Sequence, residues 1–452
     1  MKSQHLPAAF SMVAAIVFTV LVTSPFGWAQ SLSTQGVSTP ATPQDTAAPS
    51  PGLTLAELEQ IALHSNPTLA QAKAEIQAAA ARKLQSGLYP NPTVGYQGEQ
   101  IRGGIQGGGE QGFFVSQDIV LGGKLGLNRN VYEQQKKQAE AEAEEQRLRI
   151  INGVRVSYYQ ALAAQKMVDL RHKLAKLAED AVETSRQLGN VGQADQPDVL
   201  EAEVEGEQAE LAVVAAEQNQ IRRWRELAAT VGKPEMPLAP LVGNLEDMPE
   251  DNPDQWMQAI LKESPAVKIA QLGVLKAEAS LARAKRDPVP NLQLRGGLEK
   301  NLELEAITNR AIGLQGFAEV GVQIPLFNRN QGSVGVARSD LERAQQEVQR
   351  VQLVLRERAA ALLQNYATLR TTVERYRDRM IPRAREAYEL YSRNYSGMAA
   401  AYPQVLIAQR TLFQLQADYI TALENLWASS IALKGFLLTD GLEAPTRAGE
   451  MD

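Results

Sequence analysis

The residues best suited to chemistry are three carboxylates near the middle of the chain. Asp195, Asp198 and Glu201 lie close together just after a glycine-containing segment. Carboxylates gathered at a constriction attract cations and raise one another's pKa by mutual repulsion. A second interpretation is local, because Pro197 favours the first turn of a helix, where acidic residues cap the helix and complement its dipole. Both interpretations are open at this stage.

No group of residues has the spacing of a catalytic, metal or cofactor site. Cysteine is absent, which excludes disulfides, thiol catalysis, thiolate ligands and a lipid attached through cysteine. His5 lies in a predicted secretion signal, and His64 and His172 have no partner at ligand spacing. The serines lack a base at a recognisable spacing. We therefore expect neither an enzyme nor a bound cofactor.

The composition favours extended helices over a thick globular core. Hydrophobic residues make up 44 % of the 452 residues, but aromatic residues only 6 %, and the mean hydropathy is -0.27. Long stretches free of proline are rich in Ala, Gln, Glu, Leu and Arg, which are strong helix formers. The net charge of -6, with basic residues dispersed among acids, predicts no nucleic-acid surface.

The first part of the chain has the features of a secretion signal and a tether. An apolar run over residues 8–22 follows Lys2 and precedes a small-x-small cleavage pattern at residues 27–29, so residues 1–29 are predicted to be a signal peptide. Residues 30–52 are rich in Ser, Thr and Pro and are predicted to be disordered. Beyond the signal, no stretch approaches a transmembrane helix, so any entry into a bilayer would require strands.

The rest of the chain contains an internal repeat. Three prolines recur about 198 positions later with similar neighbours, as an internal repeat requires: Pro67, Pro90 and Pro92 match Pro265, Pro288 and Pro290. We predict a first repeat over residues 53–232, a linker over 233–252, a second repeat over 253–438 and a tail over 439–452.

Each repeat is predicted to contain the same series of elements. A helix of roughly 35 residues (55–87 and 253–286) ends before a Pro-x-Pro motif. Two strands follow in each repeat, at 93–101 and 113–120 and at 291–298 and 317–327. A very long helix comes next, at 124–188 and 332–394, and a return helix begins at Pro197 or Pro403. Pro382 is expected to bend the second long helix.

Four strands per chain cannot close a barrel inside a bilayer, so the sequence predicts an oligomer. Two, three or four chains would give about 8, 12 or 16 strands, all even numbers compatible with outer-membrane barrels. Closing the barrel would also gather the long helices into a cylinder. The predicted fold class is therefore mainly α with membrane β, with duplicated long antiparallel helices and four strands per chain.

This duplicated pattern resembles the TolC-like outer-membrane efflux family over residues 53–438. The segments LYPNPTVGY from Leu88 and SQDIVLGGKL from Ser116 are similar to the cation-efflux branch that includes CzcC. The resemblance implies a homotrimer with a barrel of about 12 strands in outer-membrane lipid. It also implies a periplasmic tunnel of helices that docks with a periplasmic adaptor protein and an inner-membrane efflux pump.

The resemblance places the periplasmic gate and the adaptor contact at the two helix-turn-helix tips. Members with an acidic constriction carry it on the second tip, where this chain has Gln404 and Ile407, so an uncharged narrowing is an alternative to an acidic ring of Asp195, Asp198 and Glu201. The adaptor-contact candidates are the tip glycines Gly189, Gly192 and Gly397.

The leading functional hypothesis is passive conduction of a substrate delivered by a pump. A heavy-metal cation, a drug or a secreted molecule would each be compatible with such a duct. The alternative is a periplasmic coiled-coil adaptor or scaffold, which would also have a secretion signal and long antiparallel helices.

Overall fold

A computed structural model describes residues 52–101, 109–191, 195–248, 252–305, 307, 310–396 and 402–444. The predicted signal peptide, nearly all of the predicted tether and the tip residues Gly192 and Gly397 lie outside these residues. Residues 1–50 form a separate unit from the rest of the chain, and everything below concerns the second unit. Within the described residues, no helix combines the length and apolarity needed to cross a membrane.

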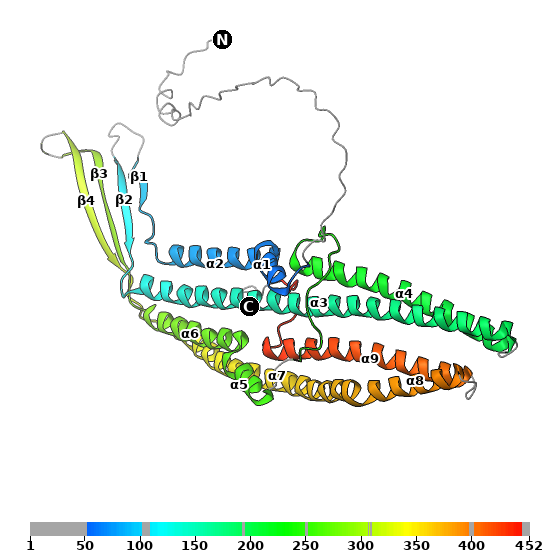
Figure 1. The fold of residues 1–452 in the computed structure, drawn as a ribbon. Helices are drawn as coiled ribbons and strands as arrows, with labels where there is room; N and C mark the ends of the chain where they lie inside the picture. The colour runs from blue at the N-terminus through cyan, green and yellow to red at the C-terminus, as the bar shows by residue number, and fades with distance from the viewer. Residues whose placement is uncertain are drawn as a thin grey trace, which may run out of the picture. The chain divides into compact units, whose positions relative to one another are not determined.

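The two repeats have the same order of helices and strands (Figure 1). The first contains α1 (Leu55–Ser65), α2 (Pro67–Ser86), β1 (Thr93–Glu99), β2 (Glu110–Ile119), α3 (Lys124–Asn190) and α4 (Gln196–Val231). The second contains α5 (Pro253–Glu263), α6 (Pro265–Arg286), β3 (Leu292–Leu304), β4 (Ala311–Val322), α7 (Gln331–Arg375), a π turn (Tyr376–Met380), α8 (Ile381–Ser396) and α9 (Tyr402–Lys434).

The first helix of each repeat is broken in two, which corrects the prediction of single helices over 55–87 and 253–286. Asn66 and Ser264 have extended backbones, with ψ of 123° and 134°. Each precedes a proline, whose ring disfavours the α conformation in the residue before it. The Asn66 side chain then accepts a hydrogen bond from the Thr68 N–H and caps the new helix.

Pro382 interrupts the second long helix through a π turn. Proline has no N–H, and its ring clashes with the carbonyl four residues earlier. The chain accommodates it with wider hydrogen bonding, in which the Ile381 N–H donates to the Tyr376 carbonyl. The first repeat has Lys176 at the matching position, and α3 runs unbroken for 67 residues, a length of about 100 Å.

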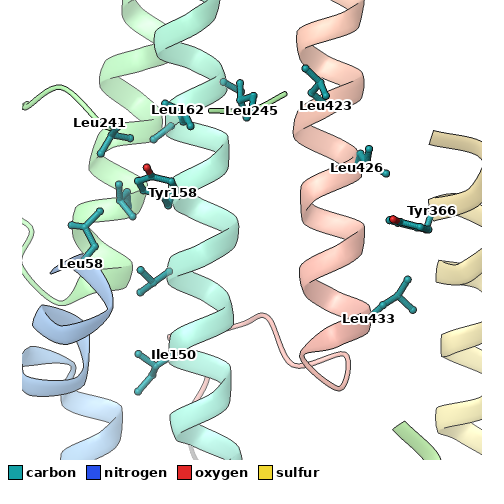
Figure 2. Close-up of a cluster of buried hydrophobic side chains, with 14 of the residues drawn as sticks. Leu58, Ile150, Tyr158, Leu162, Leu241, Leu245, Tyr366, Leu423, Leu426 and Leu433 are labelled. Atoms are coloured by element: carbon teal, nitrogen blue, oxygen red, sulfur yellow. The ribbon is translucent and has the colours of Figure 1, made fainter. Parts of the chain in front are cut away.

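The main core joins both repeats and the linker. Figure 2 shows Leu58 of α1, Tyr158 of α3, Tyr366 of α7 and Leu426 of α9 in one buried cluster with Leu241 of the linker. In the sequence, apolar residues recur at alternating steps of three and four over residues 351–373, which predicts a coiled-coil seam. The structure confirms this seam on α7, since these positions are buried or half-buried against the core: Val351, Leu355, Ala359, Leu362, Tyr366, Leu369 and Val373.

Buried amides hold the segment that follows α9 against α3. The Asn152 Nδ2 donates to the carbonyls of Gly435 (3.1 Å) and Leu438 (2.9 Å). The Gln146 Nε2 donates to the Thr68 hydroxyl (2.8 Å) and to the Glu443 carbonyl (3.1 Å). Both amides are almost fully buried, so these bonds are needed to satisfy groups that water cannot reach.

Candidate functional site

The four strands form one antiparallel sheet in the order β1-β2-β3-β4. The β2–β3 pairing joins the first repeat to the second, with Val115 opposite Gly296. Two strands are longer or shifted relative to the prediction: β3 continues to Leu304, and β4 begins at Ala311 and ends at Val322, before the predicted end at Phe327. The outer edges of β1 and β4 have no strand partner among the described residues.

One face of this sheet is apolar and exposed. Side chains alternate along a strand, so residues that are register partners share a face. Tyr96, Phe113 and Leu298 form one such row. Large apolar side chains on this face are 38–75 % exposed, and their number indicates a surface that meets something apolar: Val94, Tyr96, Phe113, Val115, Leu294, Leu298, Leu314, Val320 and Val322.

The opposite face is polar, apart from two phenylalanines. Arg295 lies near its centre, with its Nη1 3.7 Å from Glu319 Oε2, and its Nη2 donates to Gln97. The other polar residues of this face are Thr93, Glu99, Glu110, Ser116, Asp118, Gln293, Glu299, Asn301 and Gln315. A sheet with one apolar and one polar face suits a boundary between lipid and water.

The sheet is connected directly to the helices. The Lys124 Nζ at the start of α3 donates to the Val289 carbonyl just before β3 (2.7 Å), and the Asn330 Nδ2 at the start of α7 donates to the Ala284 carbonyl of α6 (2.9 Å). The starts of both long helices therefore lie beside the end of α6 and the loop that follows it, at the same end of the sheet (Figure 1).

At the first tip, the acidic residues lie at the start of α4. Asp195 occupies the N-cap position, but its side chain makes no capping hydrogen bond; its carbonyl accepts from the Asp198 N–H (3.0 Å). Asp198 lies in the first turn and is half-buried, and Glu201 is exposed. Burial and the nearby Asp198 charge raise the pKa of Tyr395 on α8, so Asp198 lies near the second hairpin.

At the second tip, Gln404 and Ile407 lie on the exposed face of α9, and the Ile407 side chain is 64 % exposed. They continue into a polar stripe with the same spacing, formed by Thr411, Gln414, Asp418, Thr421 and Asn425, in which Asp418 is the one carboxylate and accepts a hydrogen bond from Gln414. The two tips meet through Ala202 and Leu406, which pack with Val182 and Tyr395. Gly189 is the last but one residue of α3.

Sequence analysis missed Arg295 and the α9 stripe as features of the site. Arg295 is a single charge in a strand-like segment and its neighbours come from three other strands, so only the register identifies them. The α9 stripe does have a sequence signal, because polar residues, among them the carboxylate of Asp418, recur at alternating steps of three and four.

The family model for outer membrane efflux proteins matches residues 58–233 and 256–437. The chain belongs to the outer membrane efflux protein family. A curated relative, the cobalt-zinc-cadmium resistance protein CzcC of Cupriavidus metallidurans, is 25 % identical over 398 residues, which are 88 % of this chain and 92 % of CzcC.

Solved channels of this family have the same fold. The structure of CusC aligns with a TM-score of 0.70 at 17 % identity, over 85 % of this chain and 92 % of CusC. The outer membrane protein VceC of Vibrio cholerae aligns with a TM-score of 0.68 at 18 % identity, over 86 % of this chain and 97 % of VceC. The fold predicted from the sequence, long duplicated helices with four strands, is confirmed.

Proposed function

We propose that this efflux protein is one subunit of a homotrimeric duct that spans the outer membrane and extends into the periplasm. The observation that carries the proposal is the sheet with two different faces and two open edges. Three copies of a four-stranded sheet give twelve strands, an even number that closes without an edge in lipid. The apolar face then contacts lipid, and the Arg295 face lines a water-filled lumen.

The helices favour the same closure. On α4, the side chains of Leu200, Val204, Leu211 and Val214 are 54–69 % exposed and form a stripe along one side. Away from α4 in Figure 1, α7, the π turn and α8 expose Leu353, Met380 and Leu390, respectively. A head-to-tail contact between these two edges joins neighbouring subunits and closes into a ring.

The tips supply the periplasmic end of the duct. Gln404 and Ile407 form an uncharged narrowing, while Asp195, Asp198 and Glu201 attract cations to its rim. Gly189, Gly192 and Gly397 are the proposed contact residues for a periplasmic adaptor. An inner-membrane pump provides the energy, because a duct that conducts passively has no energy source of its own.

The similarity to CzcC along most of the chain favours a heavy-metal cation as the transported substrate. A drug or a secreted molecule is the competing possibility, since a duct need not bind what its pump has selected. Growth of a deletion strain on cobalt, zinc and cadmium salts, compared with growth on hydrophobic drugs, distinguishes these substrates. Complementation restricted to the drugs would contradict the cation assignment.

Single-channel recording tests the duct itself. Purified protein in a planar bilayer is expected to show small or rare openings, and Asp198→Asn with Gln404→Ala to show larger or more frequent ones because the tips are loosened. Absence of conductance in all these proteins would contradict the proposal. Release of the mature chain from membranes by carbonate, without detergent, would instead favour the periplasmic scaffold.

A further inference from the structure

A single row of residues crosses the polar face of the sheet in the order Gly95, Phe114, Gly297, Phe317. Each phenylalanine lies beside a glycine on the neighbouring strand. A Cβ at Gly95 would be 2.5 Å from the Phe114 ring, and a Cβ at Gly297 would be 2.7 Å from the Phe317 ring. The outer atoms of each ring therefore lie over a glycine, where the side chain of any larger residue would displace the ring.

Arg295 covers this row. Its guanidinium carbon lies 4.3 Å from the centre of the Phe114 ring and 5.7 Å from that of the Phe317 ring. Hydrogen bonding to Gln97 on β1 and the ion pair with Glu319 on β4 hold the guanidinium across the sheet. One side chain thus contacts all four strands, and cation–π attraction favours rings that stay beneath it.

We propose that Arg295 sets the bore of the strand duct by holding Phe114 and Phe317 flat against its wall. The inference rests on the proposed function, in which this face lines the lumen. Without the guanidinium, rotation about the Cα–Cβ bond lets each ring leave its glycine and project into the water path. Arg295 is a positioning residue, since its effect on conduction passes through the two rings.

The conductance of trimers in a planar bilayer distinguishes this steric role from a role of charge. Removing a positive charge from the lumen increases cation current, whereas rings that project into the lumen decrease it. The substitutions Asp198→Asn and Gln404→Ala are present in every protein compared, so that the tips do not limit the current. In potassium chloride, we expect Arg295→Ala in this background to lose conductance relative to wild-type Arg295, and the triple variant Arg295→Ala, Phe114→Ala, Phe317→Ala to regain it. Arg295→Lys retains a cation over the rings and is expected to lie between wild type and Arg295→Ala.

Gln293→Ala is the matched control, because Gln293 lies on the same strand and face but in a different row, opposite Asp118 and Gly321; it is expected to conduct as wild type does. An Arg295→Ala conductance equal to or above wild type would overturn the inference, as would a loss that the triple variant does not restore. In either case a conducting wild type leaves the duct proposal intact.

A second measurement does not depend on conduction. The measurement uses 4-fluorophenylalanine at position 114 or 317 of the folded trimer. The change in ¹⁹F chemical shift when H₂O is replaced by D₂O reports how far the ring is exposed to water. This change is expected to be small in wild type and larger in Arg295→Ala. Equal shifts in the two proteins would show that Arg295 does not hold the rings down, whatever the conductance.

Discussion

The fold raises the pKa of the Glu142 carboxyl on α3, so that this group ionises at a higher pH than an ordinary glutamate does. Burial is the main cause, and the charges of Glu145 and Glu75 add to it, while Lys276 on α6 opposes them; together they raise the pKa of Glu142 to about 7. Its Oε2 is buried without a hydrogen-bond partner. The ionised form is therefore disfavoured in the folded state relative to the unfolded chain.

This pKa predicts how stability depends on pH. A raised carboxyl pKa contributes stability that is complete below pH 4.5, the ordinary value, and that is lost as the pH rises through about 7. Glu142→Gln removes the penalty, so its melting temperature is expected to exceed that of wild type at pH 8 and to match it at pH 4. Thermal unfolding followed by circular dichroism at both values measures this.

The control is Glu144→Gln on the same helix, where an exposed carboxylate pairs with Arg147. Exposed pairs of this kind contribute less than about 0.5 kcal/mol, so its melting temperature is expected to change little at either pH. A Glu142→Gln protein that melts below wild type at pH 8 would contradict the assignment.

The Asn152 amide on α3 holds the segment that follows α9. Asn152→Ala removes two hydrogen bonds and leaves the Gly435 and Leu438 carbonyls unsatisfied by this side chain. The expected loss is about 2–3 kcal/mol of unfolding free energy, with faster proteolytic removal of residues after α9. Asn219→Ala, which removes one exposed bond to Arg222, is expected to be near neutral.

At the scale of elements, the π turn is the main local difference between the two repeats. Pro382→Ala restores an N–H and removes the ring that the turn accommodates. We expect α7 and α8 to become one regular helix, with a gain of about 1 kcal/mol, part of the ~3 kcal/mol that proline costs inside a helix. Hydrogen exchange tests this prediction, because the amides over residues 376–382 are expected to exchange more slowly in Pro382→Ala than in wild type.

Pro197→Ala is the matched control, because that proline lies in the first turn of α4, where its missing N–H has no helical acceptor to lose. Its amide exchange is expected to match wild type. Unchanged exchange at residues 376–382 in the Pro382→Ala protein would show that the π turn has another cause.

Periodicity predicted the elements better than it predicted their ends. The α7 seam was found because Leu355, Tyr366 and Val373 follow a coiled-coil spacing. The breaks at Asn66 and Ser264 were missed because helical patterns continue on both sides of each proline. The Arg295 cluster was beyond sequence reasoning, since its partners are 22 to 198 residues distant and only strand register brings them together.

At the scale of the whole molecule, assembly depends on the exposed stripe of α4. Leu211 and Val214 are 69 % and 54 % exposed in the single chain. Leu211→Glu with Val214→Glu would bury two unpaired charges at the subunit contact, so the trimer is expected to dissociate in detergent by light scattering. Thr421→Glu is the control. It adds a carboxylate to the exposed face of α9, away from the α4 stripe, and is expected to leave the trimer intact.

The pairing of β2 with β3 has a consequence for symmetry. This junction joins the two repeats inside one chain, and in the proposed trimer β4 of one subunit and β1 of the next would join them again between chains. The ring then has six nearly equivalent sectors built from only three polypeptides. Assembly therefore requires fewer separate association events. Alternate sectors can also differ in structure, and the π turn, which is found in the second repeat but not at the matching position of the first, is one such difference.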